Sequence, residues 1–304
     1  MIRMRRVPAT AALAVLVATL ATACSGPGGQ PAPAPAPASA GSCHAGVSGA
    51  ENWIMGSGEL SAAQAAGASS VRYAVGSAHL FVLLLRGQTS TAGQEVADFR
   101  SYAELKKMIR QGTIAPGIRW VMYDNEQWSL TPADEQADPV HYEQLFARLA
   151  HRQGYKVILA PAQDLVPGFD KNSFRAGQAV WPSYLSMGLA AASARAADIY
   201  EIQAQPYEMS VYRSQHAYAD FVAAAAAQAR AANPCIVIYA GLSTQRVSSA
   251  AQLLQDYEAT RHLVNGYWLN IPRHDQPGPP GLADQFLRTI PASASASAAT
   301  CAGA

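Results

Sequence analysis

Residues 119–128 read Arg-Trp-Val-Met-Tyr-Asp-Asn-Glu-Gln-Trp, an apolar segment that runs into two carboxylates. Side chains two residues apart in a strand point the same way, so Asp124 and Glu126 are expected to share a face at the strand's end. Acids in that position are costly unless they are paired, hydrogen-bonded or open to a cleft. The stretch therefore indicates either a cleft site or an N-cap or surface ion pair in a strand-to-helix loop.

Strands and helices alternate on both sides of this stretch. We predict strands at 81–86, 120–124, 157–162, 199–205, 236–240 and 267–271, with weaker candidates at 53–55 and 71–75. We predict helices at 102–111, 140–153, 184–197, 218–232, 252–263 and 283–288. The clearest is 140–153, which has Asp138 as N-cap, Pro139 in its first turn and Gly154 as its stop.

This alternation predicts a parallel sheet covered by helices, and we assign residues 45–290 to one α/β domain. A closed (β/α)8 barrel, the TIM-like fold, is the first interpretation. An open doubly wound sheet is the second, and it is less favoured because no glycine-rich phosphate loop follows any strand.

The strand at 199–205 supports the barrel, because one of its sides carries Glu201, Gln203 and Gln205. A strand sandwiched between helix layers would be apolar on both sides, whereas a barrel strand can carry polar residues inward near the mouth. We expect the following sets to face inward as well: Val157, Leu159, Pro161 and Gln163; Val237, Tyr239, Gly241 and Ser243; Trp268 and Asn270. The alternative is that Gln203 and Gln205 are buried amides that satisfy each other.

The expected mouth combines a few carboxylates with many amides, hydroxyls and aromatic rings. Its members would be Asp124, Glu126, Gln127, Gln163, Asp164, Gln203, Gln205, Glu208, Ser243, Thr244, Gln245 and Asn270, beside Trp128, Tyr207, Tyr239 and Trp268. Amides donate to and accept from hydroxyls, and aromatic faces suit the apolar faces of sugars, so we expect a polysaccharide or other polar glycan as partner. Trp128 and Trp268 are the better platforms, because Tyr239 is expected in the core.

Other chemistries find little support. The net charge of +1 and the lack of a basic patch argue against nucleic acid. No Gly-x-Ser-x-Gly elbow and no metal-binding histidine spacing occur, so we expect neither a serine hydrolase nor a resident metal or cofactor. Two acids, Asp124 and Glu126, are by themselves weak evidence for a bound cation.

Tyr123-Asp124-Asn125-Glu126 at a strand end, followed by Gln203-Ala204-Gln205-Pro206-Tyr207, resembles barrel glycoside hydrolases of the chitinase type. The resemblance implies Glu126 as general acid, Asp124 as the residue that orients the substrate, Tyr207 as a substrate contact and Trp268 as the floor. It covers a small part of the chain. Upstream, where that family carries further acids, this chain has Arg119 and Met122.

The N-terminus has the build of a secretory signal. Arg3, Arg5 and Arg6 precede a short apolar run, and residues 20–24, Leu-Ala-Thr-Ala-Cys, resemble a lipobox with Leu one place early. We assign 1–24 to a lipoprotein signal and 25–44 to a Pro/Ala-rich disordered tether, which places the protein outside the cytoplasm with Cys24 as its lipid anchor. The alternative is an ordinary secreted protein.

The C-terminal residues 291–304 are mostly Ala and Ser and are expected to be a disordered tail that contains Cys301. We expect a disulfide between Cys43 and Cys301, which flank the domain, in preference to pairings of Cys235. Cys235 opens a predicted strand and is expected to be merely buried.

Two function classes follow. The first is a lipid-anchored glycoside hydrolase of an envelope or extracellular polysaccharide, with Glu126 as general acid and Glu208, Asp164 or the substrate itself as the second acid. The second is a non-catalytic glycan-binding or structural envelope lipoprotein.

Replacing Cys24 tests the anchor. Cys24→Ser removes the only atom that could carry the lipid, so in a bacterial host the protein should move from the membrane fraction to the soluble fraction. Immunoblots of the two fractions and the mass of the N-terminal peptide measure this. An unchanged distribution, or an N-terminal peptide without lipid, would refute the anchor.

Overall fold

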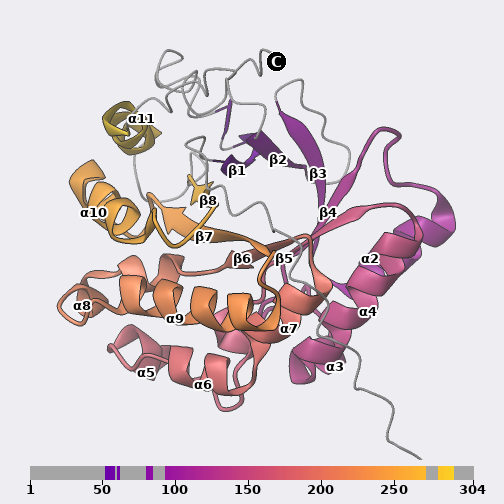
Figure 1. Ribbon diagram of the computed structural model, residues 1–304, viewed down its shortest axis with the longest axis horizontal. Coiled ribbons are helices and arrows are strands. Elements are labelled where there is room, and N and C mark those ends of the chain that lie inside the picture. The colour runs from indigo at the N-terminus through magenta and orange to yellow at the C-terminus, as the bar shows by residue number, and fades with distance from the viewer. Residues whose placement is uncertain (1–51, 59, 62–79, 85–92, 272–279, 291–304) are drawn as a thin grey trace, which may run out of the picture. The chain divides into compact units, whose positions relative to one another are not determined.

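The computed structural model describes residues 52–58, 60–61, 80–84, 93–271 and 280–290 (Figure 1). The signal, the tether, the tail, the weak strand candidate at 71–75 and the cysteines at 24, 43 and 301 lie outside the described residues.

Eight parallel strands close into a barrel in simple sequence order, with β8 hydrogen-bonded to β1. The strands are β1 (Asn52–Gly56), β2 (Leu80–Leu84), β3 (Gln94–Phe99), β4 (Trp120–Tyr123), β5 (Lys156–Leu159), β6 (Ile199–Ile202), β7 (Val237–Ser243) and β8 (Gly266–Asn270). The closed barrel predicted from the alternation is therefore confirmed, and the open doubly wound sheet is excluded.

Helices cover the outside of the barrel. They are α2 (Tyr102–Gln111), α3 (Ala133–Ala137), α4 (Pro139–Arg152), α5 (Lys171–Arg175), α6 (Trp181–Ser186), α7 (Leu189–Ala196), α8 (Ser210–Arg213), α9 (Ala217–Ala232), α10 (Ala250–Thr260) and α11 (Pro280–Thr289). Two short 3-10 helices, η1 (Gln163–Leu165) and η2 (Gln205–Glu208), follow β5 and β6. Helices α4, α7 and α9 lie side by side along one flank (Figure 1).

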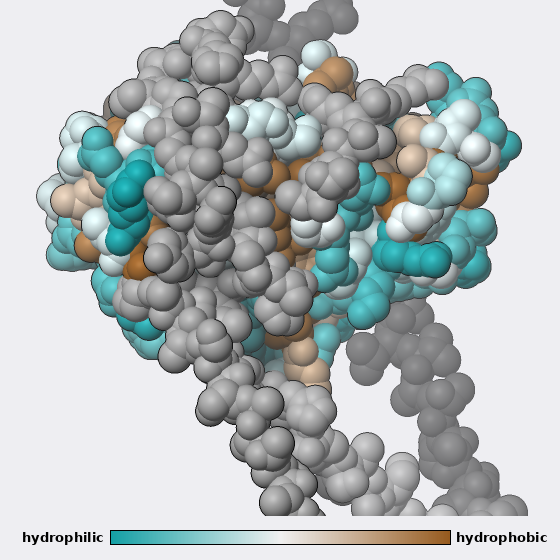
Figure 2. Space-filling model, turned by 90° about the horizontal axis from the view of Figure 1, so that it is seen from above, coloured by the Kyte–Doolittle hydropathy of each residue, from teal (hydrophilic) through white to brown (hydrophobic). Residues whose placement is uncertain are grey.

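The face shown in Figure 2 carries both polar and apolar described residues. Hydrophilic residues prevail at both sides of the view in Figure 2, and hydrophobic residues show between them. No helix in the described part of the chain is long and apolar enough to span a bilayer.

The barrel interior confirms the expected register of β6, β7 and β8. Inside, the apolar side chains are Ile54, Phe81, Leu83, Val96, Trp120, Met122, Ile158, Ala160, Ile199, Tyr239 and Trp268. Ile199 faces inward, so the alternation of the strand also turns Glu201 inward, while Tyr200 and Ile202 pack against the helices.

The register expected for β5 is wrong by one residue. Ile158 and Ala160 face the barrel interior, and Val157 and Leu159 pack outward against Phe146 of α4. Both sides of this strand are apolar, so its sequence carries no signal that separates inside from outside.

Strand β3 was not among the strands predicted from the sequence. Its residues, Gln-Glu-Val-Ala-Asp-Phe, are half polar, and only Val96 and Phe99 among them are fully buried. Val96 points into the barrel, so Asp98, two residues on, does too. The missed strand therefore brings a carboxylate to the mouth.

Cys235 is exposed and takes part in a disulfide, so the expectation that it is merely buried is wrong. Its partner must be one of the other three cysteines, all of which lie outside the described residues. A lipidated sulfur cannot form a disulfide. If Cys24 carries a lipid, Cys235 pairs with Cys43 or Cys301, and the Cys43–Cys301 bridge cannot form. The two predictions, lipidation and that bridge, exclude each other.

The ends of the helices follow their local chemistry. The Asp138 side chain accepts a hydrogen bond from the His141 backbone at the start of α4, and Gly154 follows the helix at φ 82°, as predicted. At the start of α2, the Ser101 hydroxyl accepts from the Glu104 backbone.

A buried carboxylate, Glu135 in α3, joins α2 to β4. Its oxygens accept hydrogen bonds from the backbone of Tyr102 at 2.7 Å and Ala103 at 3.0 Å, both at the N-terminus of α2. The Tyr123 hydroxyl at the end of β4 donates to the same carboxylate at 2.6 Å. An anion at a helix N-terminus is stabilised by the helix dipole, so Glu135 fixes the end of the strand that leads into Asp124.

Removing this carboxylate should destabilise the whole barrel. Glu135→Ala leaves two backbone N–H groups and a tyrosine hydroxyl buried without partners, and we expect a loss of about 3 kcal/mol or more in the free energy of unfolding. Chemical denaturation measures it. The matched control is Glu258→Ala, because Glu258 is exposed on α10 and its loss should cost about 0.5 kcal/mol or less. Equal effects of the two changes would contradict the role of Glu135.

Candidate active site

A cavity of about 440 Å³ lies at the carboxyl ends of the barrel strands. Its lining comprises Glu126, Gln127, Ala162, Gln163, Asp164, Phe169, Lys171, Phe174, Arg175, Gln203, Gln205, Pro206, Met209, Ser243, Gln245, Arg246, Trp268 and Asn270. Trp268 and Asn270 thus face the same cavity as Gln203 and Gln205, which confirms that prediction. Barrel enzymes keep their active sites at this end.

Gln203 ties three strand ends together. Its side-chain Nε2 donates to Asp124 Oδ1 and to the Ala160 backbone carbonyl, both at 2.7 Å. The backbone carbonyl of Gln203 accepts a hydrogen bond from Gln163 Nε2 at 2.7 Å. These bonds join the ends of β4, β5 and β6. The alternative in which Gln203 and Gln205 satisfy each other is wrong for Gln203, whose amide donors are used elsewhere.

The position of the Gln205 side chain depends on a glycine in β7. The side chain of Gln205 occupies the space in which a Cβ on Gly241 of β7 would stand. Any larger residue at 241 would push the Gln205 amide away from β7. The inward glycine of β7 therefore sets where this cavity-lining amide lies.

Asp124 is buried at the end of β4, and Glu126 is partly exposed in the loop that follows. Burial raises the pKa of Asp124 well above its ordinary range, and the charges of Glu126 and Asp98 raise it further. The surroundings of Asp124 therefore favour its protonated form.

Glu126 is the acid of this pair that lines the cavity. Burial first, and then the charge of Asp164, raise the pKa of Glu126 to about 7, while Arg100 opposes the shift. A carboxyl group that titrates near neutral pH can both give and take a proton there, which is what general acid–base catalysis requires.

Asp164 is the second acid of the cavity, one of the candidates from the sequence. Its Oδ1 accepts from the Gln127 backbone at 2.9 Å, which links the loop of Glu126 to η1. Glu208, the other candidate, is fully buried, accepts from the Ser243 backbone at 2.8 Å and is not among the lining residues.

Two further acids at the mouth were missed as site residues. Asp98 of β3 forms an ion pair with Arg100 at 2.9 Å, and burial raises its pKa to about 6. Glu201 of β6 is fully buried, neither of its oxygens has a partner among the described residues, and burial raises its pKa well above the ordinary range. The polar side of β6 signalled Glu201, whereas nothing signalled Asp98 because its strand was missed.

Trp268 is the one predicted aromatic platform that lines the cavity. Its indole N–H is buried without a partner among the described residues. Trp128 lies outside the lining, because its indole N–H donates to Thr131 at 2.8 Å and the Arg100 guanidinium lies 5.8 Å from its ring centroid.

The two tyrosines predicted as substrate contacts pack within the structure instead. Tyr207 is buried in η2, and its hydroxyl accepts from the backbone of Val180 and Trp181 at 3.1 and 2.9 Å. Tyr239 packs edge-on against Phe81 inside the barrel. The role that the chitinase resemblance implies for Tyr207 is therefore not supported by its position.

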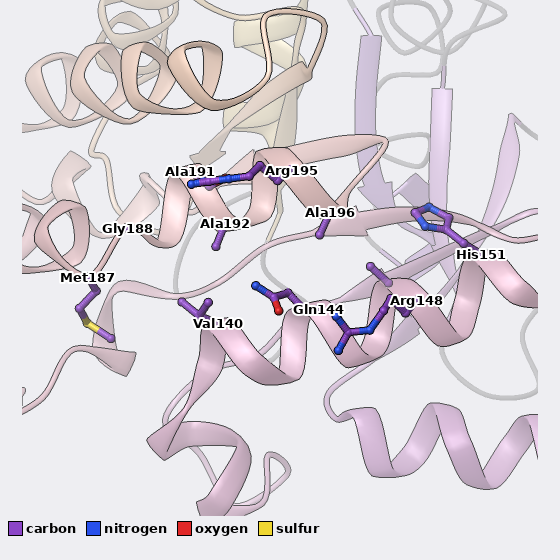
Figure 3. A pocket seen from close by; sticks show the side chains of 11 residues that line it. Val140, Gln144, Arg148, His151, Met187, Gly188, Ala191, Ala192, Arg195 and Ala196 are labelled. Atoms are coloured by element: carbon purple, nitrogen blue, oxygen red, sulfur yellow. The ribbon is translucent and has the colours of Figure 1, made fainter. Parts of the chain in front are cut away.

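A second cavity, of about 510 Å³, lies outside the barrel between α4 and α7 (Figure 3). Its lining comprises Val140, Gln144, Ala147, Arg148, His151, Met187, Gly188, Ala191, Ala192, Arg195 and Ala196. It is the larger of the two, yet its lining holds no carboxylate and no aromatic ring apart from the histidine. The mouth cavity is therefore the better candidate active site.

Comparison with known proteins returns nothing: no family model matches the chain, and no curated protein matches it. The resemblance to chitinase-type barrels thus has no support from comparison, and the site must be argued from its geometry. Among the described residues, no group of three or more His, Cys, Asp or Glu side chains is placed to hold a metal ion.

The electrostatics of Glu126 can be measured directly. In carbon-detected NMR of the side-chain carboxyls, with Glu126→Gln for assignment, we expect a pKa of about 7 for Glu126. Asp164→Asn should lower that pKa, because it removes a neighbouring negative charge. Asp220→Asn, an exposed change on α9, should leave it unchanged. A pKa in the ordinary range, or no response to Asp164→Asn, would contradict this account.

Proposed function

We propose that this protein is a glycoside hydrolase in which Glu126 is the general acid. The observation that carries the proposal is the position of Glu126: it lines a cavity at the carboxyl ends of the barrel strands, with its pKa raised to about 7. A carboxylic acid that stays protonated near neutral pH can protonate the leaving oxygen of a glycoside.

Asp164 serves as the second carboxylate of this mechanism. It lines the same cavity, where its ionised form can take a proton from a water molecule that attacks the anomeric carbon, or can itself bond to that carbon in an intermediate that water then hydrolyses. Asp124, held by Gln203, fixes the loop that carries Glu126. The proton moves from Glu126 to the glycosidic oxygen as the bond to the anomeric carbon breaks.

Two unpartnered groups in the cavity suit sugar hydroxyls. The buried indole N–H of Trp268 is a donor without an acceptor, and the buried Oε1 of Gln163 is an acceptor without a donor, among the described residues. Sugar hydroxyls both donate and accept hydrogen bonds, so they offer partners for a donor and for an acceptor of this kind. Phe169 and Phe174 add apolar surface to the same cavity.

The substrate we propose is an envelope or extracellular polysaccharide, reached from a lipid anchor at Cys24. This part of the proposal rests on the charged start, apolar run and Pro/Ala-rich tether of the sequence. The alternative is a non-catalytic glycan-binding or structural lipoprotein, in which Asp124 and Glu126 only hold the loop.

Glu126→Gln tests the general acid. The amide keeps the shape of the side chain but carries no transferable proton, so turnover should fall by about 10²- to 10⁴-fold while ligand affinity is largely kept. Reducing-end release from a panel of envelope and storage glycans measures turnover. In the unaltered protein the rate should fall as pH rises through about 7, because Glu126 must be protonated.

Asp124→Asn and Glu258→Gln complete the series. Asp124→Asn should cost less turnover than Glu126→Gln, because Asp124 acts through its neighbour, and the exposed Glu258→Gln should cost none. A purely structural role would instead lower thermal stability in both mouth variants and leave glycan binding intact. Full turnover of Glu126→Gln would refute the assignment.

A further inference from the structure

Three cationic side chains line the mouth cavity beside its two acids. Lys171 and Arg175 lie on α5, and Arg246 follows β7, whereas the acids of the lining are Glu126 and Asp164. Lys171 and Arg175 are four residues apart in one helix, so they lie on the same face. The cavity therefore has one wall with two positive charges and a third charge from a different element.

None of the three cations forms a close ion pair among the described residues, although the charge of Lys171 lowers the pKa of Asp164 and that of Arg246 lowers the pKa of Glu126 and of Glu208. No ion pair within 4.0 Å and no side-chain hydrogen bond joins Lys171, Arg175 or Arg246 to a described neighbour. The nearest acid in sequence, Asp170, is already engaged at the start of α5, where it accepts from Asn172 and Ser173. The three charges are thus available to a ligand.

The acids of the mouth do not cancel these charges at neutral pH. Burial raises the pKa of Glu126 to about 7 and the pKa of Asp124 and of Glu201 well above the ordinary range, so it disfavours a negative charge on each of these acids. Asp98 is paired with Arg100. The lining holds three cations, Lys171, Arg175 and Arg246, against two acids, Glu126 and Asp164, so positive charge is in excess even when both acids are ionised. The space offered to a ligand is therefore net positive.

We propose that the glycan this site takes is anionic, a sugar polymer that carries carboxylate or phosphate groups beside the bond to be cleaved. The inference rests on the proposed function and narrows its substrate class. Guanidinium and ammonium groups on one wall bind such oxyanions, and arginine does so in a bidentate manner. The apolar rings of Phe169 and Phe174, on the same wall, would lie against the sugar that bears the charge.

The test is direct binding, which does not depend on turnover. Full-length Glu126→Gln is titrated against an array of acidic glycans, in which uronate oligosaccharides stand beside their carboxyl-reduced forms and phosphorylated glycans beside their dephosphorylated forms. We expect an acidic member to bind about tenfold more tightly than its neutral counterpart, and the preference to weaken as salt is added. The uronate and phosphate arms identify which oxyanion is recognised.

A triple variant locates the effect. Lys171→Gln, Arg175→Gln and Arg246→Gln together should remove most of the preference for the acidic member and leave the neutral glycan's affinity nearly unchanged. All three side chains are exposed, so the fold should persist, and circular dichroism checks it.

The matched control removes the same total charge from the outer helices. Arg148 and Arg152 lie on α4 and Arg195 lies on α7, and Arg148 and Arg195 line the second cavity (Figure 3). Replacing all three with Gln should keep the preference in full. A preference lost equally in both triple variants would mean a general charge effect and would overturn the proposal.

The remaining outcomes separate this inference from the proposed function. Equal binding of acidic and neutral members, or no binding of any acidic member, overturns the anionic substrate, even if neutral glycans are hydrolysed. Tight, charge-dependent binding of an acidic glycan supports it. If the unaltered protein then hydrolyses no glycan, the hydrolase proposal fails and the ligand class stands.

Discussion

The carboxylate of Glu135 is the contact on which the mouth of the barrel depends. It binds the first backbone N–H groups of α2 and the hydroxyl of Tyr123 at once, so three elements meet at one buried charge. The loop that begins one residue later carries both acids of the Asp-x-Glu pair. Thr131, whose hydroxyl donates to the Arg100 carbonyl at 2.8 Å, closes the same loop from its other end. A rigid loop is what gives Glu126 a defined position in the cavity.

Buried acids, at the mouth and between two helices, set how the free energy of unfolding depends on pH. The pKa of Asp98 is about 6, that of Glu126 about 7 and that of Glu143, buried between α4 and α7, about 8, each raised mainly by burial above the ordinary 3.8 or 4.5. Groups that are harder to ionise in the folded state favour folding below their unfolded pKa, and that contribution is lost as pH rises through the folded values. The fold is therefore expected to weaken between about pH 4 and pH 8. The raised pKa values that suit acid–base catalysis near neutral pH therefore lower the free energy of unfolding as the pH becomes alkaline.

Much of the barrel and half of the mouth could be predicted from sequence, and the failures have physical causes. The inward side of β6 carries Glu201 and that of β8 ends in Asn270, so their inward residues were predicted correctly, whereas β5 is apolar on both sides and its register was not specified. Tyr207 was misplaced because the chain leaves the extended conformation at Gln205 and turns into η2, where alternation no longer applies. The cavity-lining charges on α5 were not predicted, because the sequence of a short helix after a strand does not show which of its side chains face the barrel mouth.

The glycine in β7 has one more consequence. Because the Gln205 amide fills the volume that a side chain at 241 would take, the width of the mouth is governed by a position that never meets the ligand. A methyl group there would overlap the Gln205 amide, so this cavity-lining side chain would have to shift. Selectivity for ligand size in this barrel can therefore change through a single small residue on the wall, while every side chain that meets the ligand keeps its identity.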